Sequence, residues 1–300
     1  MAVSIPCGLT RPGLTRPGLT RPLELVSEPV ELLRADLILR ELSSQSRGRL
    51  RNLEILPEVD STSTRLMATK PPPLGLADVC TTELQHAGRG RLGRRWIAPF
   101  GSGLAMSVAW GFSDAARAVP ALSLGVGVAV SRALMRSGAV AIVLKWPNDI
   151  WYRDRKLGGV LVEVRAEAGG VAQVVIGIGL NVHLTAAARL EIESGGARVA
   201  AVADACRTPP SRNGIAGALL DELLSMLGQF EHHGFSALRD EWTALDALNG
   251  RPVLLQQGEK QSQGIARGAD VDGALLLEIE GRLQRFVSGE ASLRLIEGET

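Results

Sequence analysis

The chain has 300 residues, of which 45% are hydrophobic, and its formal net charge is +1. This length and composition suit a globular protein with one large and one small domain, and the balanced charge argues against a broadly basic nucleic-acid-binding protein. The three cysteines lie far apart without metal-ligand spacing, so neither a disulfide framework nor a zinc site is expected, and a reducing, cytoplasmic setting fits. No apolar run approaches the roughly 18 residues of a membrane span, and the N-terminus lacks the apolar core of a signal peptide.

Residues 10–23 repeat the sequence Thr-Arg-Pro-Gly-Leu, twice in full and once truncated. Because repeated Arg-Pro steps and Pro-Gly turns cannot form a helix or a strand ladder, residues 1–25 are expected to be a disordered tail. The alternatives are an overextended start of the gene and a tether to a membrane or a nucleic acid.

Residues 26–249 are predicted to form one domain with helices and strands. In chain order, apolar periodicity predicts a helix over residues 30–42, a strand over 53–59, a helix start at 60–62, strands over 79–84 and 104–110, a helix over 121–136, strands over 140–145, 157–165 and 171–181, and helices over 214–232 and 238–248. Asn213 is expected to cap the helix that follows it.

The pattern of the sequence changes after the turn dipeptide Asn249-Gly250. Short alternating strands over residues 252–256, 261–267, 274–280 and 283–287 are separated by glycine turns. A small β-barrel over residues 250–300 is therefore predicted.

The segment with the densest chemical character is residues 88–96, Gly-Arg-Gly-Arg-Leu-Gly-Arg-Arg-Trp. Its glycines let backbone N–H groups approach an anion, and its arginines add charge, so the segment is predicted to bind phosphate or carboxylate. The spacing also fits a dinucleotide fingerprint, but that requires a helix directly after the loop, and Pro99, Gly101 and Gly103 prevent one. An RNA-binding surface loop and a solvated basic turn are the alternatives.

Three further segments contain residues that can hold ligands. Residues 145–149, Lys-Trp-Pro-Asn-Asp, follow an apolar strand, where Asp149 can bind Mg²⁺ or lie in an ordinary Asn-Asp turn. In residues 156–159, Lys-Leu-Gly-Gly, the lysine can lie beside an anion or in solvent at a hairpin. Glycines within the apolar residues 177–182 indicate that a ligand, or alternatively a helix, packs against the backbone.

Taken together, these segments resemble the biotin–protein ligase family. The similarity is carried, in the family's order and spacing, by Asp60-Ser61-Thr62, by Gln-His-Ala-Gly-Arg-Gly-Arg at residues 85–91, by residues 145–149 and 156–159, and by Gly-Leu-Asn at residues 179–181. It implies an α+β fold in which a central mixed β-sheet packed with helices, similar to class II synthetases, precedes a small SH3-like β-barrel. It also implies an enzyme that uses ATP and Mg²⁺ to convert biotin to biotinyl-5′-AMP, and that transfers the biotin to a lysine of a biotin carboxyl carrier protein or of a carboxylase domain.

The resemblance also implies roles for individual residues. Biotin is expected to contact Ser61, Thr62, Ser63, Gln85, Gly88, Arg89, Gly90, Arg91, Lys156 and Gly158. ATP is expected to contact Arg91, Arg94, Trp96, Lys145, Asn148 and Asn181. The expected catalytic residues are Lys156, Arg89, Arg91 and Asp149, of which Asp149 is either a Mg²⁺ ligand or a base. Two residues depart from the family's pattern: Ser63 stands where asparagine is usual, and Leu92 where a basic residue is common.

Other functions remain as alternatives to this one. A lipoate–protein ligase has a related architecture, although the arginine-rich segment and the C-terminal barrel favour biotin. A nucleic-acid-binding regulator and a biotin-sensing scaffold are the others. Some members of the family carry an N-terminal DNA-binding domain and act as repressors, but only about 60 residues precede Ser61 here. We therefore expect no DNA partner, no membrane partner and no repressor role, and either a monomer or a homodimer.

Overall fold

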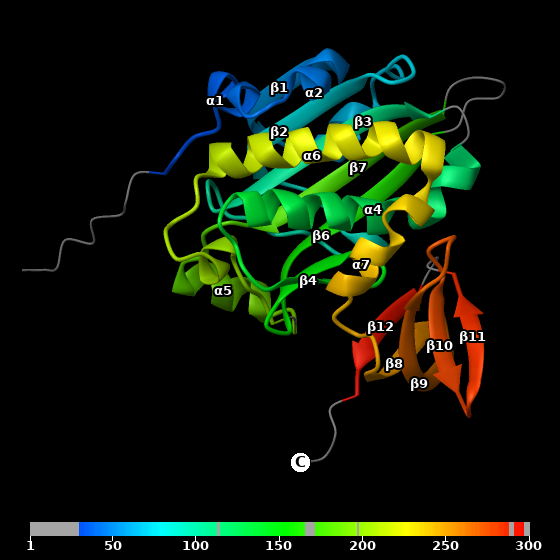
Figure 1. The fold of residues 1–300 in the computed structure, drawn as a ribbon. Coiled ribbons are helices and arrows are strands. Elements are labelled where there is room, and N and C mark those ends of the chain that lie inside the picture. Colours follow the sequence, from blue (N-terminus) through cyan, green and yellow to red (C-terminus); the bar gives the residue numbers. More distant parts are fainter. Residues whose placement is uncertain (1–29, 113–114, 166–171, 197, 288–290, 297–300) are drawn as a thin grey trace, which may run out of the picture.

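A computed structural model of the chain describes residues 30–112, 115–165, 172–196, 198–287 and 291–296. The expected tail over residues 1–25 lies outside these ranges. The described part contains a seven-stranded sheet followed along the chain by a five-stranded sheet (Figure 1). None of the helices in these ranges has the length and the apolar character needed to cross a membrane.

The seven-stranded sheet is mixed. Its strand order is β1 (Leu50–Val59), β2 (Ala77–Gln85), β3 (Gly103–Phe112), β7 (Ala172–Asn181), β6 (Arg155–Arg165), β5 (Asp149–Tyr152) and β4 (Ile142–Lys145). β1 and β2 pair in parallel, and the other neighbouring strands pair in antiparallel orientation. β3 and β7 are buried over nearly their whole length, which explains why their sequences are almost continuously apolar.

Two long helices, α4 (Ala115–Arg136) and α6 (Arg212–His233), lie side by side on one face of this sheet (Figure 1). Met106 and Val108 of β3 share a fully buried core with Val126 of α4 and Leu223 of α6. A short helix, α3 (Thr62–Met67), packs on the opposite face, where Leu66 belongs to a separate small core. The rest of that opposite face is available for a ligand site. The remaining helices are α1 (Ala35–Arg40), α2 (Ser44–Arg49), α5 (Ala186–Glu193) and α7 (Arg239–Leu245).

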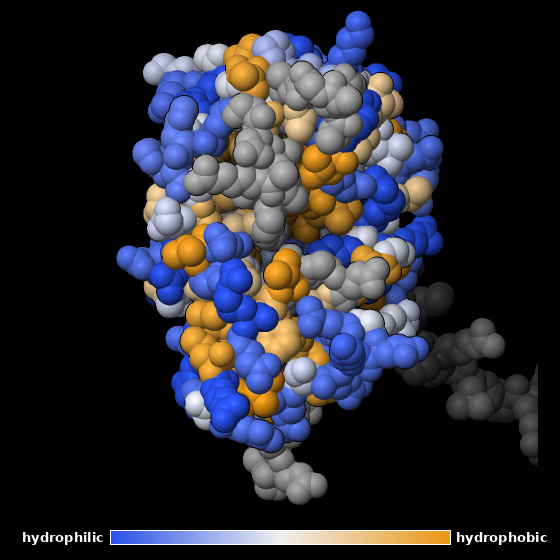
Figure 2. Space-filling model, turned by 90° about the vertical axis from the view of Figure 1, so that its right-hand side faces the viewer, coloured by the Kyte–Doolittle hydropathy of each residue, from blue (hydrophilic) through white to orange (hydrophobic). Residues whose placement is uncertain are grey.

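The five-stranded sheet is antiparallel throughout. Its order is β11 (Arg282–Phe286), β10 (Leu275–Ile279), β9 (Lys260–Ala269), β8 (Pro252–Gln257) and β12 (Ala291–Leu295). The turn before β10 connects the five-stranded sheet to the large sheet. Trp146, which follows β4, donates a hydrogen bond from its Nε1 to the carbonyl of Gly273 in this turn (3.0 Å). A Cβ on Gly273 would lie 2.7 Å from that of Ala121, so this contact requires glycine. On the face seen in Figure 2, hydrophobic residues form several separate groups among hydrophilic ones.

The expected fold class is confirmed: a mixed sheet with helices is followed by a small antiparallel, SH3-like sheet. The helix expected over residues 30–42 is present but shorter, as α1. The helix α2, which lies beyond the expected range, was not predicted, and Ser43 begins it by accepting a hydrogen bond from Ser46 N (3.2 Å). Ser211, not Asn213, caps α6, because Ser211 Oγ accepts from Gly214 N (3.1 Å). β5, α5 and β12 were not expected from the sequence.

Candidate active site

A cavity of about 990 Å³ opens on the sheet face opposite α4 and α6. Its floor follows the strand register, since Ala105, Gly179, Gly159, Asp149 and Lys145 form one row across β3, β7, β6, β5 and β4. Side chains alternate between the two faces along each strand, so the residues of this row point to the same face. The sheet thereby brings together residues from segments 145–149, 156–159 and 177–182.

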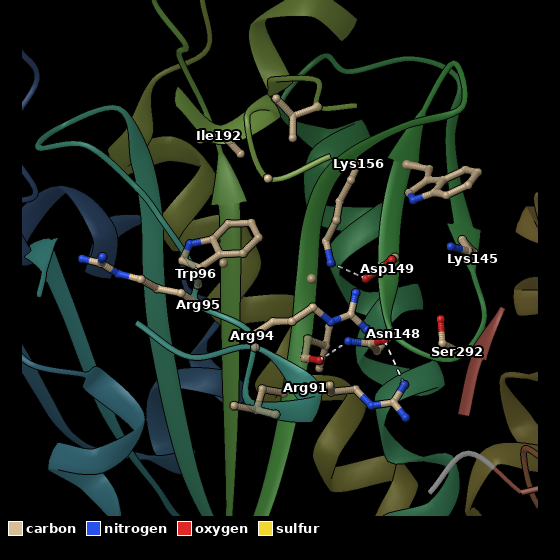
Figure 3. A pocket seen from close by; sticks show the side chains of 18 of the residues that line it. Arg91, Arg94, Arg95, Trp96, Lys145, Asn148, Asp149, Lys156, Ile192 and Ser292 are labelled. Carbon is tan, nitrogen blue, oxygen red and sulfur yellow. Dashed lines mark hydrogen bonds and ion pairs between the residues drawn. The ribbon is translucent and has the colours of Figure 1, made fainter. Parts of the chain in front are cut away.

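One end of the cavity is charged (Figure 3). Lys156 Nζ lies 2.5 Å from Asp149 Oδ1 and 6.0 Å from the centre of the Trp96 ring. The backbone of Lys156 is paired as well: its N–H donates to the carbonyl of Arg198 (3.0 Å), and its carbonyl accepts from Ala200 N (2.9 Å). Lys156 thus projects from a fixed backbone into the cavity, where an ammonium group can hold an anion. We call Lys145, Asn148, Asp149 and Lys156 the charged end.

Lys145 contributes a second ammonium group to the charged end. Its Nζ lies 4.6 Å from the centre of the Trp151 ring, within the range of a cation–π interaction. Burial is the main cause that lowers the pKa of Lys145, and the nearby cations Lys156, Arg94 and Arg294 lower it further, against the opposing effect of Asp149. A bound anion would relieve the repulsion among these cations.

The other end of the cavity is lined by hydroxyl groups. Ser107 Oγ lies 2.7 Å from Thr62 Oγ1 and 2.9 Å from Ser63 Oγ, and Thr62 N donates to Gln85 Oε1 (2.9 Å). Thr62, Ser63 and Ser107 are buried. Because a hydroxyl group both donates and accepts, this cluster can bind a neutral polar group of a ligand. We call Thr62, Ser63, Gln85 and Ser107 the hydroxyl end. Ser61, which begins α3, also lines the cavity.

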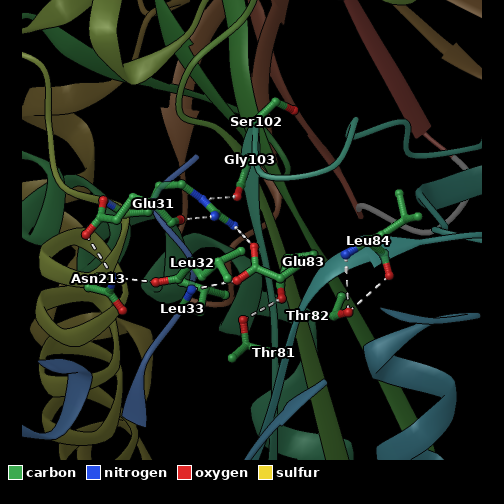
Figure 4. A network of polar contacts seen from close by, with 12 residues as sticks. Glu31, Leu32, Leu33, Thr81, Thr82, Glu83, Leu84, Ser102, Gly103 and Asn213 are labelled. Atoms are coloured by element: carbon green, nitrogen blue, oxygen red, sulfur yellow. Dashed lines mark hydrogen bonds and ion pairs between the residues drawn. The ribbon is translucent and has the colours of Figure 1, made fainter. Parts of the chain in front are cut away.

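Gln85 follows a part of β2 that is anchored by a buried ion pair. Arg212, at the start of α6, is 1% exposed and lies 2.7 Å from Glu83 Oε2 (Figure 4). Arg212 Nε also donates to the carbonyl of Gly103 (3.0 Å), and Leu33 N donates to Glu83 Oε1 (2.5 Å). This network joins β2, β3 and α6 two residues before Gln85, and so fixes the base of the hydroxyl end.

The glycines of β7 allow two side chains to approach its backbone. A Cβ on Gly179 would lie 2.5 Å from Cε2 of Trp96, and one on Gly177 would lie 2.6 Å from Ser63 Oγ. The close packing expected for residues 177–182 therefore comes at Gly177 from Ser63 of helix α3, as the helix alternative anticipated, and at Gly179 from Trp96. Trp96 lies against the floor and lines the cavity, where it can stack on a planar ring.

Residues 88–96 form a short hairpin, which we call the arginine hairpin. Trp96 N donates to the carbonyl of Gly88 (2.8 Å), Gly90 N donates to that of Arg94 (2.6 Å), and Leu92 at the tip has φ 57°. Arg91 crosses to the opposite wall of the cavity, where it donates to Asn148 Oδ1 (3.2 Å) and to the carbonyl of Ala291 in β12 (3.3 Å). The hairpin thus connects the large sheet to the small one.

The other arginines of the hairpin differ in direction. Arg89 Nη2 lies 2.9 Å from Glu163 Oε2 on β6. Arg94 is exposed and lines the cavity. Arg95 points away from the charged end in Figure 3, and its Nη2 donates to the carbonyl of His86 (3.3 Å).

Two expected asparagines are engaged with the protein itself. Asn148 Nδ2 donates to the carbonyl of Val160 (2.7 Å), which leaves its Oδ1 facing Arg91. Asn181 is 2% exposed, and its Nδ2 donates to the carbonyl of Ala200 (3.1 Å). Asn181 therefore holds the segment that pairs with Lys156.

Two expected residues, Gly88 and Gly158, are not part of the cavity wall. A Cβ on Gly88 would lie 2.6 Å from the carbonyl oxygen of Trp96, and one on Gly158 would lie 2.6 Å from that of Gly179. Both positions therefore require glycine for close backbone packing. The cavity wall brings together the other expected residues: Ser61, Thr62, Ser63, Gln85, Arg89, Gly90, Arg91, Arg94, Trp96, Lys145, Asn148, Asp149, Lys156 and Asn181.

Sequence reasoning missed three parts of the wall. Ser107 is a single serine within a buried apolar strand, and its polarity at an inward position was the available signal. Ser292 and Arg294 reach the cavity from β12. Ile192 and its neighbours reach it from the end of α5. The last two parts come from elements that the sequence analysis did not predict, so no pattern pointed to them.

Within the described ranges, no group of three or more His, Cys, Asp and Glu side chains is close enough to hold a metal ion. Asp149, the expected metal ligand, is bonded to Lys156. Mg²⁺ commonly binds through one or two carboxylates together with the phosphates of a nucleotide. The site therefore suits a magnesium ion that is held chiefly by a bound triphosphate, with Asp149 as the carboxylate of the floor.

Comparisons with known proteins show which family the chain resembles. The model of the Biotin/lipoate A/B protein ligase family matches residues 56–181, and that of the Biotin protein ligase C terminal domain matches residues 249–294. The chain is 38% identical to the Bifunctional ligase/repressor BirA of Salmonella typhimurium over 270 residues, which are 90% of this chain and 81% of that protein. It is 32% identical to the Biotin--[acetyl-CoA-carboxylase] ligase of Mycobacterium tuberculosis, over 86% of this chain and 96% of that protein. The solved structure of the biotin protein ligase from Aquifex aeolicus in complex with biotin and ATP has a TM-score of 0.69 and 27% identity, covering 82% of this chain and 100% of that one.

Proposed function

The chain belongs to the biotin protein ligase family, and from this premise we propose that it activates biotin with ATP as biotinyl-5′-AMP and transfers the biotin to a lysine of a biotin carboxyl carrier protein or domain. The observation that carries this proposal is the pairing of a hydroxyl end and a charged end within one cavity. Such a cavity suits a substrate with a neutral polar ring at one end and a carboxylate at the other. Biotin has this shape.

In the proposed complex, the ureido ring of biotin occupies the hydroxyl end. Its carbonyl and N–H groups exchange hydrogen bonds with Thr62, Ser63 and Ser107, which bond to one another in this structure. Ser63 stands where the family usually has asparagine. The shorter hydroxyl still reaches Ser107, so the ring contact is supplied by a pair of serines. The carboxylate of biotin then points along the floor toward Lys156.

The first step joins two anions, because the biotin carboxylate attacks the α-phosphorus of ATP. A P–O bond forms as the bond to the β-phosphate oxygen breaks, and pyrophosphate leaves. Lys156 and the arginine hairpin supply positive charge where negative charge develops. Trp96 provides a flat surface for the adenine ring. Magnesium, when bound with ATP, neutralises charge on the phosphates.

In the second step, the amine of a carrier lysine attacks the acyl carbon of biotinyl-5′-AMP. An amide bond forms, the bond to the AMP phosphate oxygen breaks, and the amine loses a proton. Asp149 was expected as a base or as a metal ligand. Its 2.5 Å bond to Lys156 supports a third role, in which Asp149 orients the ammonium group toward the reacting phosphate. We propose this positioning role as the main one.

The experiment that tests the proposed function is a mass measurement. The protein is incubated with biotin, ATP, Mg²⁺ and an isolated biotin carboxyl carrier domain, and the carrier should gain the mass of one biotinyl group. A carrier in which the acceptor lysine is replaced by arginine is the control and should stay unmodified. An unchanged wild-type carrier would refute the proposal.

The alternative substrate is lipoate, because the family model that matches residues 56–181 covers both acids. Lipoate has a carboxylate tail but a ring without polar hydrogen-bonding groups. It would make none of the hydrogen bonds that the ureido ring makes with the hydroxyl end, each of which contributes about 0.5–1.5 kcal/mol. Calorimetry with each acid should therefore give tighter binding of biotin. We also propose that the chain does not act as a repressor, and filter binding to operator-like and random DNA tests that statement.

A further inference from the structure

Glu163 lies near the site, but the proposed chemistry does not use it. It faces Val175 across the β6–β7 pair, and Val175 belongs to the small core beneath α3, so Glu163 is on the cavity side of the sheet. Two residues earlier on β6, Leu161 lines the cavity beside Gly177. Glu163 therefore stands at the rim of the hydroxyl end.

The partner of Glu163 belongs to a segment that begins three strands away in the large sheet. Arg89 belongs to the arginine hairpin, which follows β2, and β3 and β7 lie between β2 and β6. Three strand spacings amount to about 14 Å. The 2.9 Å contact between Arg89 Nη2 and Glu163 Oε2 consequently draws the hairpin across β3 and β7, above the floor that carries Ser107 and Gly177.

This ion pair contributes little to folding, because the side chains of Arg89 and Glu163 are 45% and 22% exposed. The geometry of this ion pair instead suits a contact that holds the arginine hairpin closed over the cavity. One nitrogen of the guanidinium group is bonded to Glu163, and the group has five N–H donors in total, so a ligand carboxylate in the cavity can bind the others. Glu163 thus orients Arg89 without consuming its capacity to bind an anion.

We propose that Glu163 is a positioning residue that latches the arginine hairpin over the hydroxyl end and thereby slows the escape of the molecule bound there. The inference rests on the proposed function in naming that molecule as biotin or biotinyl-5′-AMP. Two sets of contacts then hold the arginine hairpin on opposite walls of the cavity. Arg89 forms an ion pair with Glu163 on β6, and Arg91 donates hydrogen bonds to Asn148 and to β12. The first closes the hydroxyl end, and the second closes the charged end.

The test compares Glu163→Gln with Glu54→Gln in the full chain. Glu54 is the matched control, because it also pairs with an arginine over 2.9 Å, and this arginine, Arg65, does not line the cavity as Arg89 does. Labelled biotinyl-5′-AMP is formed on each protein and chased with unlabelled biotin. Glu163→Gln should release the label about fivefold faster than wild type, as expected for the loss of one partly exposed ion pair. Salt should quicken release from both proteins, because the adenylate is anionic, but it should quicken release from wild type more, since only wild type also loses the Arg89–Glu163 attraction.

A second measurement needs no ligand. Trypsin cleaves after arginines in an accessible loop, so the arginine hairpin of Glu163→Gln should be cut about fivefold faster than in wild type or in Glu54→Gln. If the two variants were cleaved by trypsin at the same rate and released biotinyl-5′-AMP at the same rate, the proposed role of Glu163 would be wrong. Slower release from Glu163→Gln would also overturn it, since Glu163 would then compete with the ligand for Arg89. If wild type forms no adenylate, the proposed function fails, and trypsin cleavage still decides whether the latch exists.

Discussion

The two ends of the cavity are built from different kinds of structure. The hydroxyl end comes from the first turn of α3, the centre of β3 and the end of β2, and its groups are hydrogen-bonded to one another. The charged end gathers residues of the β4–β5 hairpin and the start of β6, and Arg91 of the arginine hairpin joins it to β12 of the small sheet. The large sheet and α3 together therefore prepare the hydroxyl end, whereas the charged end is complete only when the arginine hairpin and the small sheet are in place.

The largest effect is expected from Lys156→Ala, at the charged end. A hydrogen bond to a charged group contributes about 1.5–3 kcal/mol, so the rate of pyrophosphate release with biotin and ATP should fall roughly a hundredfold. Biotin binding measured without ATP should change far less if the two ends are separate. Lys260→Ala, at an exposed position on β9, is the control. A rate close to that of wild type would exclude Lys156 from the chemistry.

Ser107→Ala addresses the hydroxyl end. Removing this hydroxyl group takes away the partner of Ser63 Oγ, whereas Thr62 Oγ1 keeps Gln85 Oε1 (3.2 Å), and an unpaired buried group costs about 1–3 kcal/mol. The Kd for biotin should rise about thirtyfold, while the KM for ATP stays the same. Ser131→Ala is a matched control, because Ser131 is equally buried but lies on α4 outside the cavity wall. If the Kd for biotin and the KM for ATP rose by the same factor, the two ends of the cavity would be coupled, and the distinction between them would be wrong.

Gly179→Ala tests the role of the cavity floor in ATP binding separately from its role in the stability of the fold. The added methyl group would lie 2.5 Å from the indole of Trp96, a flexible side chain that can move, so the KM for ATP should rise about tenfold with little loss of stability. In Gly158→Ala, the methyl group would lie 2.6 Å from a backbone oxygen that cannot move away. This second variant should lower the thermal midpoint instead. If both variants behaved alike, Trp96 would not be the nucleotide platform.

The sequence predicted the parts of the fold whose patterns are strong and local. Continuous apolar strands such as β7, and the long helix α6 with its apolar stripe, were expected because burial dictates their composition. β5 and β12 were not predicted, and their lengths of four and five residues do not explain this, because the equally short β4 and β11 were predicted. α2 was not predicted, because the apolar spacing that indicated a helix ended at Leu42, before Ser43 starts this helix.

The candidate site divides in the same way. Lys156, Asp149 and the arginine hairpin lie in segments with unusual composition, so the sequence pointed to them directly. Ser107 was missed because one serine in a buried strand has no local pattern, and only the register that places it opposite Gly177 gives it a role. The contact of Arg91 with Ala291 joins residues 200 positions apart, and no pattern along the chain encodes such a distance.

The smallest effect is expected from Asp246, which supports the charged end from behind. Its backbone pairs with Leu144 of β4, and Ala247 N donates to the carbonyl of Leu144 (2.8 Å). Burial raises the pKa of Asp246 from 3.8 to about 6, although the hydrogen bond from Leu248 N opposes this shift. A carboxyl group whose pKa is higher in the folded protein loses stability as pH rises between the two values, because folding must then bury a charge. Asp246→Asn keeps the acceptor for Leu248 N and removes the charge, so its gain in the free energy of unfolding should be about 1 kcal/mol larger at pH 8 than at pH 5. Urea unfolding at the two pH values measures this difference. The hydroxyl end contains no titratable group, so the affinity for biotin should change little between pH 5 and pH 8. If the free energy of unfolding had the same pH dependence in Asp246→Asn and in wild type, the stability of the β4–β5 hairpin would not depend on this carboxyl group.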